Sequence, residues 1–134
     1  MGKYVELQEE IIKRYNITID ENSKCRSRMH IHVRERRICK WHPKNSAFAT
    51  FELLHEIGHA ENNNSKMRRC EEEYYATLWA IERCNEYGVP IDQKTLDAYQ
   101  RYIDMELNRG IIRHASGLPS KEELTLPGAR RKLA

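Results

Sequence analysis

The chain has 134 residues, 40% of them hydrophobic and 32% charged, a composition typical of one globular domain with its own core. The formal net charge of +3 is too small to indicate a nucleic-acid partner. No stretch approaches the roughly 20 consecutive apolar residues of a membrane helix, and the first residues lack the apolar centre of a signal peptide. We therefore expect one cytoplasmic domain with no membrane partner, whose four scattered cysteines are reduced.

The first third of the chain predicts one helix followed by a pair of strands. Apolar residues recur at helical spacing over residues 3–15, and the polar segment 16–28 has no clear pattern. Apolar and polar residues then alternate in 29–34 and again in 38–41, with a charged interruption at 35–37. This arrangement favours two antiparallel strands joined by a charged turn.

Three long helices are predicted after these strands. Asn45 or Ser46 can cap the first, Ser65 the second and Asp92 the third. Polar residues end the first helix, and Gly88 stops the second. The predicted ends lie near Glu61, Tyr87 and Gly110.

The remaining segment, 111–134, contains two glycines and two prolines, so we expect an extended C-terminal arm. Ser120 can begin a capping box there, around one short helical turn. Together the elements predict a single domain over residues 1–134 with an α+β fold. In this fold a small antiparallel sheet packs on a helical core.

The first of the three helices carries the sequence His55-Glu56-Ile57-Gly58-His59. Residues four apart share one helical face, so His55 and His59 can present their imidazole nitrogens to one metal ion. Glu56 lies about 100° further round the helix, where its carboxylate can take a proton from water beside the ion. Gly58 leaves room for another element to approach the metal. Two histidines and a glutamate can also lie on an amphipathic helix without binding a metal ion. Their spacing here nevertheless favours a metal site on a zincin-like helix.

A catalytic zinc ion needs a third protein ligand and one open position. The candidates are Glu71, Glu72 and Glu73 at the start of the next predicted helix. Acidic residues at a helix start also interact favourably with the helix dipole, and this interaction suffices to explain Glu71. Glu73 shares its face with small residues such as Ala76, which would let this helix pack close to Gly58. Glu72 lies about 100° away from that face, so we choose Glu73 as the ligand and keep Glu72 as the alternative.

Two segments carry a pattern that extends beyond the metal ligands. They are Phe51-Glu52-Leu53-Leu54-His55-Glu56-Ile57-Gly58-His59-Ala60 and Glu73-Tyr74-Tyr75-Ala76-Thr77-Leu78-Trp79-Ala80. They resemble the ImmA/IrrE metallopeptidase family, whose members typically carry H-E-[LI]-G-H followed by E-x-x-A-[DN]-x-F-A. The resemblance implies Zn²⁺ held by His55, His59 and Glu73, with Glu56 as the catalytic base. The chain departs from the family pattern at Thr77, where Asp or Asn is usual, and at Trp79, where Phe is usual.

The resemblance also implies a zinc metallo-endopeptidase that hydrolyses a peptide bond in a specific regulatory partner. In the family this partner is often a repressor or antitoxin of a phage or mobile element, and here it would be a separate chain. A non-catalytic, zinc-containing protein-binding module is the alternative. A structural zinc site needs ligands but no base, so the intact Glu56 favours the enzyme.

Other histidines and tyrosines carry weaker signals. His30 and His32 share one face of a predicted strand and could bind metal as a His-x-His pair, although ordinary surface histidines are the simpler interpretation. The strand pair itself could hold an extended peptide as an added strand. The sequence does not distinguish between the candidate donors to an oxyanion, which are His42, His114, Tyr74, Tyr75, Tyr99 and Tyr102.

Overall fold

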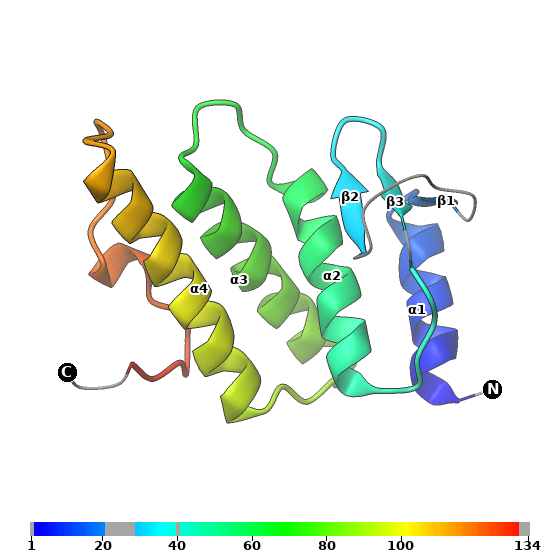
Figure 1. The fold of residues 1–134 in the computed structure, drawn as a ribbon. Coiled ribbons are helices and arrows are strands. Elements are labelled where there is room, and N and C mark those ends of the chain that lie inside the picture. Colours follow the sequence, from blue (N-terminus) through cyan, green and yellow to red (C-terminus); the bar gives the residue numbers. More distant parts are fainter. Residues whose placement is uncertain (1, 21–28, 40, 132–134) are drawn as a thin grey trace.

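Helices dominate the computed structural model, which describes residues 2–20, 29–39 and 41–131. Within these residues, four α-helices follow one another across the molecule, with a small sheet packed beside α2 (Figure 1). The helices are α1 (Lys3–Arg14), α2 (Ala47–Glu61), α3 (Arg69–Tyr87) and α4 (Gln93–Ile112), and a 3-10 turn, η1 (Glu122–Leu124), follows them. The strands are β1 (Thr18–Asp20), β2 (His30–His32) and β3 (Arg37–Cys39). The predicted α+β class is confirmed, and none of the described helices is long and apolar enough to span a bilayer.

The sheet is mixed, so the prediction of a purely antiparallel sheet is wrong. Its strand order is β1-β3-β2, in which β2 runs antiparallel to β3 as predicted and β1 runs parallel to β3. β1 falls in the polar segment 16–28 and contains one large apolar residue, Ile19, so no alternation marks it in the sequence. The charged turn between β2 and β3 needs no glycine, because Arg36 takes left-handed backbone angles (φ 51°). The Arg36 side chain is held in place by donating to the main-chain carbonyl of Tyr15 at 3.1 Å.

Side-chain caps fix where α2 and α4 begin. The Ser46 hydroxyl accepts a hydrogen bond from the main-chain N–H of Ala49 at 3.1 Å, which selects Ser46 over Asn45 as the cap. Asp92 accepts from Thr95 in the same way at 2.8 Å. Gly88 ends α3 in the left-handed conformation (φ 70°), as predicted. These boundaries place the His-Glu-x-x-His segment in the second half of a capped helix, with His59 in its last turn.

The predicted cap of α3, Ser65, is wrong. The Asn64 side chain accepts a hydrogen bond from the main-chain N–H of Lys66 at 2.9 Å, and this local turn delays the helix. The helix begins only after Arg68, whose main-chain N–H donates to the Glu71 carboxylate at 3.0 Å. Glu71 therefore serves the start of the helix, as its position in the acidic run suggested.

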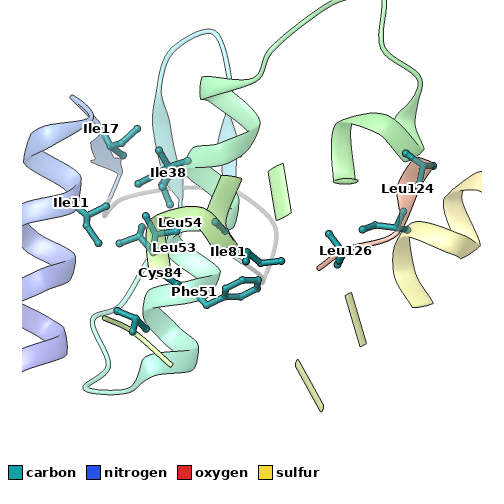
Figure 2. Packing of buried hydrophobic residues seen from close by; sticks show 14 of the residues in the cluster. Ile11, Ile17, Ile38, Phe51, Leu53, Leu54, Ile81, Cys84, Leu124 and Leu126 are labelled. Carbon is teal, nitrogen blue, oxygen red and sulfur yellow. The ribbon is translucent and has the colours of Figure 1, made fainter. Parts of the chain in front are cut away.

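Buried apolar side chains tie the sheet and the helices into one core. Figure 2 shows Ile11 of α1 and Ile38 of β3 gathering at Leu53 and Leu54 of α2, with Ile81 of α3 nearby. All five side chains are buried. The core thus fixes the rotation of α2 about its axis, which decides where its polar residues point.

The chain after α4 turns back along that helix (Figure 1). Residues 111 and 112, expected in the arm, belong to α4. Further on, Leu124 and Leu126 are buried, and the Gln100 side chain holds both. Its amide donates to the Leu124 carbonyl at 2.8 Å, and its oxygen accepts from the Leu126 N–H at 2.7 Å.

Candidate metal centre

Two adjacent helices bring His55, His59 and Glu73 together. α2 supplies the histidines one turn apart, and α3 supplies the glutamate. The Nε2 atoms of His55 and His59 lie 3.2 Å apart. The Glu73 carboxylate is 3.4 Å from Nε2 of His55 and 3.0 Å from Nε2 of His59. These residues form a group that could hold a metal ion.

The distances between the donor atoms of these side chains are close to what a small tetrahedral ion requires. Bonds of about 2.0–2.1 Å at tetrahedral angles place neighbouring nitrogen and oxygen ligands roughly 3.3–3.4 Å apart. The two imidazole nitrogens are 3.2 Å apart, and each faces one of the two Glu73 oxygens, Oε1 at 3.4 Å from His55 and Oε2 at 3.0 Å from His59, so all three distances fall around that value. Two imidazoles and a carboxylate are also a donor set that suits zinc. The residues therefore fit the ion that the sequence implied.

A hydrogen bond from α3 fixes which nitrogen of His55 carries its proton. The Thr77 hydroxyl donates its single proton to the main-chain carbonyl of Glu73 at 2.7 Å. It can therefore only accept at Nδ1 of His55, 3.1 Å away, so that nitrogen must be the protonated one. The lone pair of His55 is then left on Nε2, which faces His59 and Glu73. Thr77 thus orients a ligand histidine, the role that a charged residue could fill at this position.

Glu73, and not Glu72, meets the histidines. The Glu73 side chain is 5% exposed, whereas the Glu72 side chain is 41% exposed and its carboxylate lies 3.9 Å from the Arg69 guanidinium. Burial opposes ionisation of Glu73, but the facing imidazoles of His55 and His59 outweigh burial and lower the pKa of its carboxyl. Burial also opposes protonation of His59, yet the facing Glu73 carboxylate raises the pKa of that imidazole. In the metal-free protein each group thus favours the charged form of the other.

The close contact of α2 and α3 depends on Gly58. A Cβ atom at this position would lie 2.6 Å from the main-chain oxygen of Ala76, closer than such atoms approach. Glycine and alanine thus let the two backbones meet beside the metal ligands. This confirms that Gly58 leaves room for a neighbouring element.

A cavity of about 630 Å³ opens in front of the metal ligands. β2 and its flanking residues form one wall, and α2, α3 and α4 form the others. Glu56 lines this cavity beside the two histidines, as its place on the helix predicted. Burial raises the pKa of the Glu56 carboxyl, while the nearby histidines act in the opposite sense.

Two of the candidate oxyanion donors line the cavity, and the others do not. Tyr99 and Tyr102 of α4 line it, and the Tyr99 ring lies 5.0 Å from the His55 ring. Burial raises the pKa of the Tyr99 phenol, which keeps its proton available for donation. The other candidates do not contribute to the lining in the described part of the chain; they are His42, His114, Tyr74 and Tyr75.

Arg69 is a cavity residue that the sequence did not single out. Its guanidinium lies 3.5 Å from the Glu73 carboxylate and 3.9 Å from that of Glu106 on α4. Arg69 and Glu73 are four residues apart on α3, so the spacing carried a signal that could have identified the pair. Glu106 is buried and is also held by Arg109 at 2.7 Å. Together these charges join α4 to the metal ligands.

Comparisons of the chain with protein-family models, with curated proteins and with solved structures found no match. The functional argument therefore rests on the arrangement of these residues.

Proposed function

We propose that this protein is a zinc-dependent metallopeptidase, in which His55, His59 and Glu73 hold the ion. The observation that carries the proposal is the pair of imidazole nitrogens 3.2 Å apart, each facing one oxygen of the Glu73 carboxylate at 3.0–3.4 Å, at the floor of an open cavity. Glu56 is not one of the three proposed ligands, and it lines the same cavity. The resemblance to the ImmA/IrrE metallopeptidases supports the same assignment of all four residues.

Each of these side chains has a role in peptide hydrolysis. When bound, zinc supplies Lewis acidity toward the peptide carbonyl and lowers the pKa of water to about 7. The Glu56 carboxylate accepts the proton of the attacking water and later delivers it to the leaving amine. Tyr99 or Tyr102 donates its phenolic proton to the carbonyl oxygen as negative charge develops there. Glu73 and Thr77 keep His55 and His59 in place meanwhile.

The edge of the sheet gives an extended substrate a place to bind. Within the described strands β2 is paired only with β3, and Met29, Ile31 and Val33 of the β2 segment line the cavity. A peptide segment could add to β2 as a further strand and pass in front of the metal ligands. The resemblance points to a specific regulatory protein as the substrate, such as a repressor or antitoxin carried on a separate chain.

The experiment that tests this proposal replaces the general base. Glu56→Gln nearly preserves the shape of the side chain but cannot accept a proton, so it should retain zinc and lose cleavage. Purified protein would be mixed with the products of neighbouring genes, and fragments would be identified by mass spectrometry. Glu82→Gln, at an exposed position on α3, is the matched control and should cleave as the wild type does. Cleavage by Glu56→Gln at the wild-type rate would remove this residue from the mechanism.

The same assay distinguishes an enzyme from a non-catalytic zinc module. A module would bind a partner without producing fragments. Unstructured casein serves as a second substrate, since rapid cleavage at many sites would contradict the proposed specificity for one partner. Cleavage of one neighbour at one position, abolished by Glu56→Gln, is the expected result.

A further inference from the structure

The register of the sheet collects polar residues on one of its faces. Directly paired residues in neighbouring strands point to the same side of a sheet, and successive residues point to opposite sides. His30 pairs with Cys39, and His32 pairs with Arg37. Asp20 of β1 also pairs with Cys39. These residues therefore share a face, and the opposite, apolar face carries the middle residues of the strands: Ile19, Ile31 and Ile38.

Three of these side chains bring their donor atoms together. One ring nitrogen each from His30 and His32 and the sulfur of Cys39 lie within 4.8 Å of one another. The two imidazole rings meet edge to face, with their centroids 4.9 Å apart. Tetrahedral zinc with bonds of about 2.0–2.3 Å needs separations of roughly 3.3–3.6 Å, a contraction that small rotations of the two half-buried histidines can supply.

Charged side chains surround the Cys39 sulfur, an atom that binds metal as a thiolate. The Arg37 guanidinium donates toward the Cys39 sulfur at 3.4 Å. Its positive charge is balanced by the carboxylates of Asp20 at 2.7 Å and Glu35 at 2.8 Å, so it does not repel a cation as an unpaired arginine would. Cys39 is fully buried, which protects a metal–sulfur bond from solvent.

We propose that His30, His32 and Cys39 form a second metal site, which binds a thiophilic transition-metal ion, Zn²⁺ foremost. Two imidazoles and a thiolate suit zinc, since thiolate ligands select it over magnesium and calcium. The site shares no residue with the centre between α2 and α3. Sequence spacing shows only the His-x-His pair, and Cys39 joins it through the pairing of β2 with β3.

A metal ion at this site would stabilise the small sheet. Each strand has three residues, shorter than the usual five or six, so few main-chain hydrogen bonds hold the sheet. A metal ion bound to β2 and β3 would fix these two strands against each other. Because β2 also borders the cavity, the second ion would hold the wall of that cavity in position.

Cobalt substitution tests the proposal without reference to catalysis. Co²⁺ bound to a thiolate absorbs in the near ultraviolet by charge transfer, and the centre of His55, His59 and Glu73 contains no sulfur. Zinc-free protein titrated with Co²⁺ should show this absorption in the wild type and in Glu73→Ala. The absorption should disappear in Cys39→Ser and weaken in His32→Ala, a substitution at a half-buried position that leaves the core intact. Bound zinc should fall from about two ions per chain to about one in Cys39→Ser.

Cysteines elsewhere provide the controls. Cys70→Ser should keep the absorption, because Cys70 lies on α3 outside this group. Cys84→Ser should keep the absorption as well, because Cys84 also lies on α3 outside this group. Absence of the band in folded wild-type protein, or its survival in folded Cys39→Ser, would overturn the proposal. The band is independent of peptide hydrolysis, so this outcome would leave the proposed peptidase untouched.

Discussion

At the scale of single residues, the candidate metal centre depends on proton positions as much as on ligand identity. A histidine binds metal through the nitrogen that carries no proton, and the hydrogen bond to its other nitrogen decides which one that is. Thr77 makes this choice for His55, since its only proton goes to the Glu73 carbonyl. An uncharged side chain thereby performs the orienting role, but it adds no negative charge to strengthen the histidine as a ligand.

Removing the Thr77 hydroxyl should weaken zinc binding without changing the fold. Thr77→Val keeps the shape of the side chain and loses both hydrogen bonds, so His55 can adopt the wrong tautomer. We expect zinc affinity to fall by about 10–100-fold, measured by competition with a chromophoric chelator. Thr77→Ser retains the hydroxyl and should bind zinc nearly as the wild type does. Equal affinities for the Val and Ser variants would show that the hydroxyl does not orient the ligand.

At the scale of elements, the contact of α2 with α3 positions the centre, and glycine makes that contact possible. Alanine is the better helix former by about 1 kcal/mol, so glycine at position 58 lowers the intrinsic stability of α2. The backbone of Ala76 occupies the space that a Cβ at this position would need. Close packing therefore takes precedence over helix propensity at this point.

Gly58→Ala should destabilise the protein although alanine favours helices. The added methyl group would meet the main-chain oxygen of Ala76 at 2.6 Å, and neither backbone can move freely. Overpacking of this kind lowers the free energy of unfolding by about 1–3 kcal/mol, which chemical denaturation can measure. Gly110→Ala is the matched control in α4, because the added methyl would meet only the flexible end of the Leu118 side chain, at 2.9 Å. A Gly58→Ala variant as stable as the wild type would contradict the close contact.

The same elements show which features the sequence could predict. α2 was predictable because its cap, its apolar face and its paired histidines all lie within about fifteen residues. β1 was not, since a three-residue strand with only Ile19 as an apolar side chain exists by pairing with β3, far along the chain. Ser65 was mistaken for a cap because serine favours both turns and helix starts, and Asn64 stabilises the turn.

At the scale of the whole molecule, the centre exists because distant segments converge on α2. Glu73 could be proposed from the small residues along its helix, but Tyr99 and Tyr102 join the cavity only through the packing of α4 on α3. Such contacts depend on the crossing of helices, which spacing along one helix does not determine. The cavity wall formed by β2 likewise requires the sheet to be in place.

The third ligand provides the most direct test of the central proposal, that α2 and α3 together hold a zinc ion. Zinc content would be measured by mass spectrometry in wild-type, Glu73→Ala and Glu72→Ala proteins after dialysis against the same chelator. Glu73→Ala should lose about one zinc ion per chain relative to the wild type, because two histidines alone bind the ion weakly. Glu72→Ala should lose none, since the Glu72 carboxylate is 41% exposed and lies 3.9 Å from Arg69, while Glu73 faces the histidines. Loss of zinc from Glu72→Ala, with full retention by Glu73→Ala, would contradict the assignment of the centre.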